Sequence, residues 1–212
     1  GLALGTITVS GNVSANSLTF GSASGNITLT SGNITLGGTT PTITTNNTND
    51  TISSVLAGSA GLTKNGTGTL TLNASNTFTG NLVINSGTLA TGSAGLLGDT
   101  VQVTVNSGGT YKVGAADTIR SVTGAGNLVL NANLTLLPNV SNSAWASPTI
   151  QLSGNISGTG TLIGSSNGYS NMTLSGNNSG WSGGISMGAY TILNIGSANA
   201  TGTGTIDFVN GS

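Results

Sequence analysis

Apolar and polar residues alternate along most of this chain in short runs. The clearest runs are 6–9 (TITV), 17–20 (SLTF), 26–29 (NITL), 33–36 (NITL), 69–72 (TLTL), 102–105 (QVTV) and 127–130 (NLVL). A period of two predicts a β-strand with one buried face. Ser-Gly, Asn-Gly, Gly-Gly and Gly-Asn steps separate the runs and supply tight turns. The pattern predicts about twenty strands of roughly four to six residues, and no stretch has a helical period.

The alternation also predicts which side chains face inward. In the central part of the chain we expect Leu70, Leu72, Leu82, Ile84 and Leu89 to face one continuous core. Thr69, Thr71 and Asn73 should then face outward, because successive side chains of a strand point to opposite sides.

Strands this short are compatible with a sandwich, a barrel or a solenoid, and internal repeats distinguish among these architectures. The pattern G-x-G-T-L occurs at 66–70 and at 158–162. Each copy continues with an apolar-Thr-Leu strand, an Asn-bearing turn, one aromatic residue and a Gly. A degenerate G-x-G opening stands at 124–126. This self-similarity predicts coils stacked along an axis. We therefore expect one β-solenoid domain over 1–212 with repeat-like segments at 61–90 and 158–193; the alternative is a β-sandwich or jelly roll.

Charge is nearly absent, which removes most side chains that do chemistry. Only 3% of the residues are charged, with three Lys or Arg, four Asp and no His, Glu or Cys. Nucleic-acid binding needs clustered Lys or Arg, so we expect no nucleic-acid partner. No window approaches the roughly 18 unbroken apolar residues of a membrane span. We expect no cofactor and no metal.

The sequence contains few acidic residues that could act in catalysis. Polysaccharide cleavage needs paired carboxylates, or a carboxylate with a basic partner. Asp99 and Asp117 are about one coil apart, and Lys112 and Arg120 lie nearby in the sequence. The interpretation that we favour is that the four Asp residues are solvated charges at turns and that the chain is not an enzyme.

Two binding alternatives were weighed in the same way. The Asn-rich segment 46–50 (NNTND) could offer oxygen ligands to calcium, but it lacks the spaced acids of a dedicated loop, so a plain polar loop is favoured. The aromatic residues could form a platform for a surface glycan. Core positions for Phe and rim positions for Trp and Tyr are the favoured interpretation of Phe20, Phe78, Tyr111, Trp145, Tyr169, Trp181 and Tyr190.

The segment 61–90 resembles the autotransporter-associated β-strand repeat, also called the passenger-associated transport repeat. Its first part matches L-x-K-x-G-x-G-x-L-x-L from Leu62 to Leu72, including Lys64. N-T-F-T-G follows at 76–80 and G-T-L at 87–89. The copy at 158–193 is looser and lacks the Lys. The resemblance implies a right-handed parallel β-helix in a secreted bacterial passenger, extracellular or on the cell surface, with no enzymatic activity.

The two ends of such a solenoid would expose strand edges that natural solenoids cover with caps. Neither end of this sequence shows a charged or helical cap, whether the chain is a mature product or a fragment. We therefore expect a structural surface module that self-associates end to end into a filament, through Ile7, Val9, Ile206 and Phe208. The rival functions are an adhesin and, further off, a polysaccharide-acting enzyme.

Overall fold

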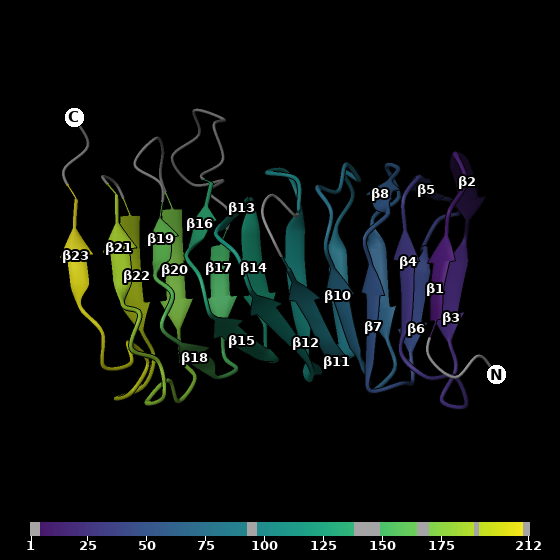
Figure 1. Cartoon of the computed structure of the whole chain (residues 1–212). Helices are drawn as coiled ribbons and strands as arrows, with labels where there is room; N and C mark the ends of the chain where they lie inside the picture. Colours follow the sequence, from purple (N-terminus) through teal and green to yellow (C-terminus); the bar gives the residue numbers. More distant parts are fainter. Residues whose placement is uncertain (1–4, 93–96, 138–148, 165–169, 189–190, 210–212) are drawn as a thin grey trace.

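The protein is a rod of stacked β-coils. The computed structural model describes residues 5–92, 97–137, 149–164, 170–188 and 191–209. About nine turns follow one another along the axis, from the N-terminal coil at one end to the C-terminal coil at the other (Figure 1). Every recorded strand pair is parallel, so the predicted parallel β-solenoid is confirmed.

Most strands belong to one extended sheet of 15 strands. The long strands β11 and β12 bend and join its two faces: one end of β11 pairs with β9 and the other with β10. The strands of this sheet are β1 (Gly5–Thr8), β3 (Ser17–Phe20), β4 (Ile27–Thr30), β6 (Thr42–Thr45), β7 (Asn49–Ile52), β9 (Leu62–Asn65), β10 (Thr69–Leu72), β11 (Leu82–Thr91), β12 (Gln102–Val113), β14 (Ser121–Gly124), β15 (Asn127–Leu130), β17 (Thr149–Leu152), β18 (Ile156–Gly158), β20 (Ser170–Leu174) and β22 (Thr191–Ile195).

Two smaller sheets complete the coils. The first contains β2 (Asn12–Ala15), β5 (Asn33–Leu36) and β8 (Val55–Ala57). The second contains β13 (Asp117–Ile119), β16 (Leu134–Leu136), β19 (Leu162–Gly164), β21 (Ile185–Met187) and β23 (Ile206–Phe208). None of the described residues is helical, and among them there is no helix that is long and apolar enough to span a membrane.

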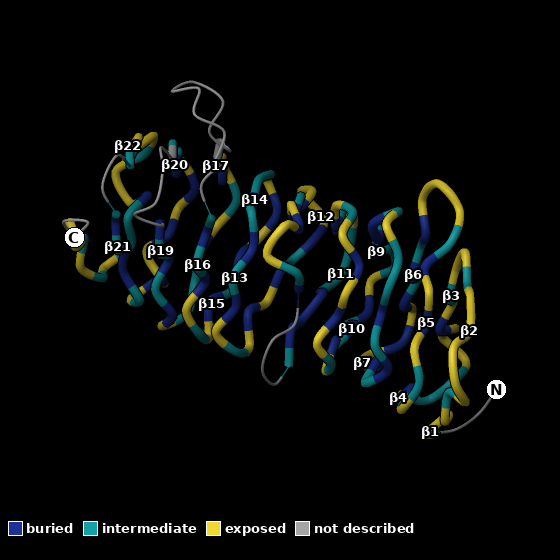
Figure 2. The backbone as a smooth tube through the Cα atoms, turned by 90° about the horizontal axis from the view of Figure 1, so that it is seen from above, coloured by how far each residue is buried: buried dark blue, intermediate teal, exposed yellow. Residues whose placement is uncertain are grey.

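The core is a set of aliphatic columns that run along the rod. Buried residues line the inside of the coils and exposed residues lie at the corners and on the outer faces (Figure 2). The register aligns Ile52, Leu72 and Thr91 in consecutive coils. All five residues predicted to face the core, Leu70, Leu72, Leu82, Ile84 and Leu89, are fully buried, and Thr69, Thr71 and Asn73 lie outside it. The predicted strand register is therefore confirmed.

Parallel stacking of the coils explains how a chain with so few charges satisfies the hydrogen-bonding groups of its backbone. Each strand inside the stack exchanges hydrogen bonds with the coil before it and the coil after it. On the surface, asparagines repeat the same contact with their side chains. The amide of Asn106 donates to Asn85 (2.7 Å), and that of Asn85 donates to Asn65 (2.9 Å). The ladder adds polar contacts between coils without any charge.

Candidate functional site

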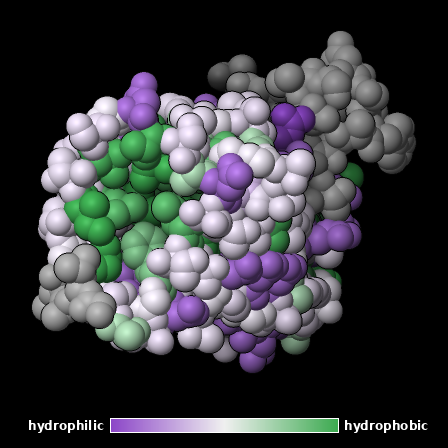
Figure 3. Space-filling view, turned by 90° about the vertical axis from the view of Figure 1, so that its right-hand side faces the viewer, coloured by the Kyte–Doolittle hydropathy of each residue, from purple (hydrophilic) through white to green (hydrophobic). Residues whose placement is uncertain are grey.

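The N-terminal end of the rod is an open apolar hollow. Viewed along the axis, hydrophobic side chains form a patch on one side of this end, bordered mainly by residues of intermediate hydropathy (Figure 3). The hollow has a volume of about 420 Å³ and is lined by Ile7, Leu18, Phe20, Ile27 and Leu29 among others. Ile7 stands in register with the buried Leu29 of the next coil, yet is 43% exposed. It occupies a core position that no other coil of the described residues covers.

The C-terminal end exposes the same kind of surface. Phe208 on β23 stands in register with the buried Met187 and is 79% exposed. Ile195 on β22 stands in register with the buried Leu174 and is also exposed. The two ends of the rod therefore both present inward-facing apolar residues and the free edges of their last strands.

The four residues predicted for self-association all lie on these two ends, in different degrees of burial. Ile7 and Phe208 are exposed, whereas Val9 and Ile206 are partly buried and pack against the core. Ile7 and Phe208 are thus the two members of this set with apolar surface left to offer a partner. Whether they bind one remains a prediction.

The repeat motif contains a buried lysine, although lysine side chains are mostly exposed in proteins. Lys64 on β9 is fully buried, in register with Ile43 and Ile84 of the neighbouring coils. Its Nζ lies within hydrogen-bond distance of four carbonyl oxygens: those of residues Asn65 (2.8 Å), Gly66 (3.0 Å), Gly68 (3.1 Å) and Ser86 (3.2 Å). An ammonium has three N–H groups, so it shares them among four acceptors. Lys64 thereby ties the G-x-G corner of its own coil to the next coil.

Burial governs the titration of this lysine. Removal from water lowers the pKa of Lys64 from 10.5 to about 8, and the negative charge of Asp50 opposes part of that shift. Asp50 occupies a core position one coil earlier, in register with Leu70, and is 1% exposed. Two of the seven charges of the chain are thus enclosed in neighbouring coils.

The lowered pKa makes stability depend on pH in one window. Between about pH 8 and 10.5 the unfolded chain holds more protons at Lys64 than the folded chain, so stability rises with pH there; below pH 8 both states are protonated and the dependence ends. We expect the free energy of unfolding to be greater at pH 9.5 than at pH 8 by on the order of 1–2 kcal/mol.

Urea unfolding followed by tryptophan fluorescence measures this difference. The series stops below pH 10, because burial raises the pKa of Tyr111 well above 10, and its contribution would be lost as pH rises through that higher value. A Lys64→Met variant should show no rise. If the free energy of unfolding of the unmodified chain does not change between pH 8 and pH 9.5, then the four carbonyl groups restore an ordinary pKa to Lys64.

An asparagine and an aromatic residue recur together in both repeat-like segments. The Oδ1 of Asn76 accepts the amide N–H of Leu56 (2.9 Å), and that of Asn178 accepts the amide N–H of Ile156 (2.6 Å). Each therefore satisfies a strand of the preceding coil. The aromatic residues that follow, Phe78 and Trp181, are both buried. The Asn-bearing turn of the repeat is thus a junction between coils rather than a solvent-exposed binding loop.

The structure brings two of the four acidic residues to one hollow. Asp99 and Asp117 both line a cavity of about 480 Å³, whereas Lys112 lines a different one. Asp117 is almost fully buried; its Oδ1 accepts the amide of Thr118 (2.9 Å) and its Oδ2 that of Leu97 (3.3 Å). Because both of its oxygens hold backbone amides, Asp117 is poorly placed to carry and release a proton as a general acid must.

The expectation that all acidic residues are solvated at turns is wrong for two of them. Asp99 and Asp207 are exposed, but Asp50 and Asp117 are buried. Asp50 accepts the amide N–H of Ile27 (3.0 Å) and the side-chain amide of Asn47 (2.9 Å). Both donors reach Oδ1, whereas the buried Oδ2 has no hydrogen-bond partner among the described residues. The donors therefore offset only part of the cost of burying this carboxylate.

The calcium alternative at 46–50 gains no support from this arrangement. Asn47 and Asp50 turn inward and bond to each other and to the preceding coil, while Asn46 and Asn49 remain exposed. The favoured plain polar loop is also too simple, because two of the five residues, Asn47 and Asp50, are buried and make hydrogen bonds within the stack. Within the described residues no group of three or more His, Cys, Asp or Glu comes together to hold a metal.

The aromatic side chains that are described do not form a surface platform. Phe20 and Phe78 are buried as predicted. Tyr111 and Trp181 are fully buried as well, so the prediction of rim positions for them is wrong. Trp181 reaches the core because its Nε1 donates to the carbonyl of Gly160 (2.9 Å). Trp145, Tyr169 and Tyr190 lie outside the described residues.

Comparison with known proteins agrees with this geometry. The family model for the passenger-associated-transport-repeat matches residues 62–90, the coils that contain Lys64, Asn76 and Phe78. A stretch of 94 residues is 46% identical to the Adhesin BmaC autotransporter of Brucella suis biovar 1 (strain 1330). That stretch is 44% of this chain but only 3% of the relative, so the chain spans a small fraction of it. No solved structure matches. Part of the chain therefore matches the passenger-associated-transport-repeat, and a stretch of it is homologous to a segment of an adhesin autotransporter, within a parallel β-solenoid.

Proposed function

We propose that the chain is a non-enzymatic structural module of a bacterial surface protein, and that copies of it stack end to end into a fibre. The observation that carries the proposal is the pair of open ends. Ile7 and Phe208 hold core positions in their columns but are exposed at opposite ends of the rod. A second copy placed head to tail would continue both columns and pair the free strand edges.

The energetics favour such a contact. The edges of β1, β2 and β3 at one end would meet those of β22 and β23 at the other. Each new backbone hydrogen bond contributes about 0.5–1.5 kcal/mol net, and burial of apolar surface adds about 25 cal/mol per Å². Together these oppose an association cost of roughly 4–15 kcal/mol. With a net charge of −1 the copies hardly repel one another. A head-to-tail contact that does not close into a ring gives an open filament.

Lysines placed on the two free edges test the fibre. Thr8 and Thr205 are exposed at opposite ends, and natural edge strands use lysine to block further pairing. In sedimentation velocity we expect the unmodified chain to grow in mass with concentration and Thr8→Lys with Thr205→Lys to remain a folded monomer. The matched control, Gln102→Lys with Ser153→Lys, adds the same charge to exposed positions at mid-rod and should assemble.

Two results would overturn the fibre. One is a monomer for the unmodified chain at the highest concentration reached, in which case the open ends belong to further coils of a longer polypeptide. The other is equal assembly by the end-modified and unmodified chains, which would place the contact elsewhere on the rod.

Adhesion is the second candidate function, and one observation favours it. The relative that shares 46% identity over 94 residues is named an adhesin, although the shared part is only 3% of it. Adhesion requires a surface that holds a ligand, such as a glycan, beside the rod rather than at its ends. Two adjoining hollows on the side of the rod support this candidate.

A further inference from the structure

Two hollows adjoin on one outer face of the rod, and together they are called the trough here. The first has a volume of about 440 Å³ and extends from Asn49 to Asn131; the second has about 350 Å³ and extends from Thr110 to Gly180. They share Thr110 and Val129 in their lining, so they lie side by side. The trough crosses β7, β10, β11, β12, β15 and β18, which are hydrogen-bonded neighbours in this order. It therefore runs along the rod axis.

The floor of the trough is an ordered array of uncharged polar groups. One column of side chains, in register from coil to coil, consists of Asn49, Thr69, Thr88, Thr110 and Asn127. Neighbouring members are about 4.8 Å apart, the distance between paired strands. Each hydroxyl or amide can both donate and accept. The column thus repeats a mixed donor and acceptor at intervals close to the length of one sugar ring.

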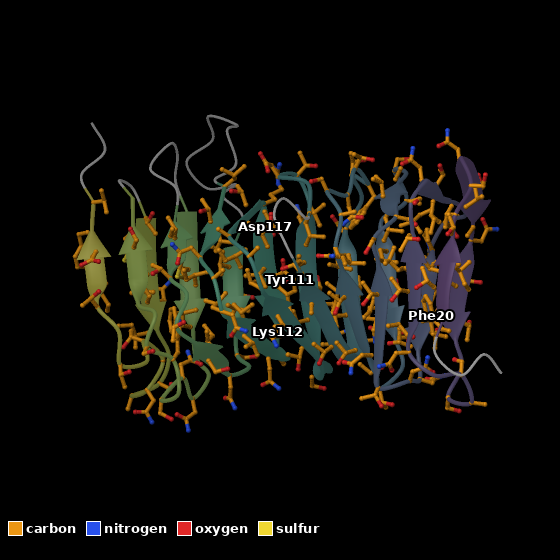
Figure 4. The ribbon with its side chains drawn as sticks, viewed as in Figure 1. Phe20, Tyr111, Lys112 and Asp117 are labelled. Carbon is orange, nitrogen blue, oxygen red and sulfur yellow. The ribbon has the colours of Figure 1, made fainter. Side chains whose placement is uncertain are left out.

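The second column of the trough differs in character. Two residues further along the same strands, Ala90, Lys112 and Val129 are in register. Figure 4 labels Lys112 beside Tyr111 on β12; Lys112 is exposed on the outer face, whereas Tyr111 is in the core. Among the described residues, Lys112 is the only charged residue that lines either hollow, and none of the lining residues is acidic. The trough therefore contains one exposed positive charge.

We propose that this trough binds an extended acidic polysaccharide, lying along the rod axis with a carboxylate against Lys112. The inference rests on the adhesive function proposed above and not on the fibre. Sugar hydroxyls would pair with the Thr and Asn column, and the C–H face of a ring would lie on Val129, which is partly exposed. The six strands of the trough, about 4.8 Å apart, give room for roughly six rings.

The same features argue against other occupants. A peptide that adds to a sheet needs a free strand edge, and five of the six strands under the trough, all except β18, are paired on both edges. Nucleic acid needs several cations to neutralise its phosphates, and Lys112 is alone. A neutral polysaccharide would use the polar column but would leave the ammonium without a partner, so it becomes one outcome of the test.

The probe is a β-1,4-linked oligomannuronate of about six sugars, matched to six strands 4.8 Å apart. Its carboxyl-reduced product is a neutral chain of the same length. Isothermal titration of the whole chain should detect binding of the acidic oligomer and at least severalfold weaker binding of the reduced one. Lys112→Gln should weaken binding of the acidic oligomer about fivefold, the upper range for an exposed ion pair, and should abolish its advantage over the neutral product.

Isosteric changes test the polar column. Thr88→Val with Thr110→Val removes two neighbouring hydroxyls but keeps β-branched side chains that suit a strand. We expect about a tenfold loss of affinity for the acidic oligomer. The matched control is Thr123→Val with Thr173→Val, which removes two hydroxyls from another hollow and should bind normally. Far-ultraviolet circular dichroism establishes that each variant is folded.

Three outcomes overturn the proposal: no binding of the acidic oligomer at millimolar concentration, equal binding of the reduced oligomer, or equal affinity in the trough and control variants. None of these bears on the fibre, because sedimentation measures that separately. Unaltered assembly with no glycan binding would retain the fibre and remove the trough.

Discussion

Leu72→Asp is expected to prevent folding of the rod, or to destabilise it by more than about 4 kcal/mol, the range of an unpaired buried charge. Leu72 is fully buried, between Ile52 of one coil and Thr91 of the next. No lysine or arginine stands in its column to accept the new carboxylate. The coils on either side are hydrogen-bonded to β10 and cannot open locally to admit water without breaking those bonds.

The control for this prediction is one residue away. Thr71→Asp places the same charge on the same strand but on the outer face, where Thr71 is partly exposed. We expect a change within about 1 kcal/mol for that variant. Urea unfolding at neutral pH compares the two. Similar losses of stability for both would contradict the alternation on which the strand assignment rests.

An aspartate at position 72 should prevent folding although Asp50 is tolerated, because the two positions differ in the hydrogen-bond donors around them. Asp50 is buried as deeply, but the amide of Ile27 and the side chain of Asn47 donate to it. Position 72 has no such donors, because its strand neighbours are apolar or paired. The cost of a buried charge is set by the donors around it more than by depth.

The fold could be predicted from the sequence because a solenoid is specified locally. Each run of alternating residues predicts its own strand, and runs such as 33–36 and 69–72 coincide with β5 and β10. The repeat of G-x-G-T-L then predicts that strands stack rather than pair as hairpins. No long-range contact had to be guessed, since each coil contacts the next along the chain.

The burial of Lys64 and Asp50 was missed although its signal was present. Lys64 stands two residues after Leu62, and Asp50 two residues before Ile52, so both are in phase with inward residues. Their charge argues for exposure and their position in the alternation argues for burial, and the structure follows the alternation. In this chain the position of a residue in the polar–apolar alternation predicts whether it is buried. A charged residue at an inward position has its own hydrogen-bond partners: four carbonyls for Lys64 and two donors for Asp50.

The trough could not have been found from the sequence. Asn49, Thr69, Thr88 and Thr110 look like four unrelated polar residues at irregular spacing. Their alignment depends on the lengths of the turns between them, and on the bend between Ile84 and Ser86 that moves β11 from one face to the other. Turn lengths of this kind carry no period that a sequence pattern can reveal.

The second large loss of stability is expected for Gly154→Ala, because this glycine lies in close contact with the backbone of the neighbouring coil. A Cβ atom on Gly154 would lie 1.8 Å from the carbonyl oxygen of Gly126 in the preceding coil. The same arrangement recurs in the next coil, where a Cβ on Gly176 would lie 2.0 Å from the oxygen of Gly154. The obstacle is backbone held in a stack rather than a side chain that can rotate away. The new methyl group must therefore push two coils apart.

We expect Gly154→Ala to destabilise the rod by about 3 kcal/mol or more, at or beyond the upper range for overpacking. The matched control is Gly21→Ala, where an added Cβ meets no atom within 4 Å and the backbone is not left-handed. That change should be neutral or slightly stabilising, because alanine restricts the unfolded chain. Thermal unfolding of both variants decides the matter. If Gly154→Ala is as stable as Gly21→Ala, then the coils are not packed at backbone contact and close stacking is not what selects glycine at these corners.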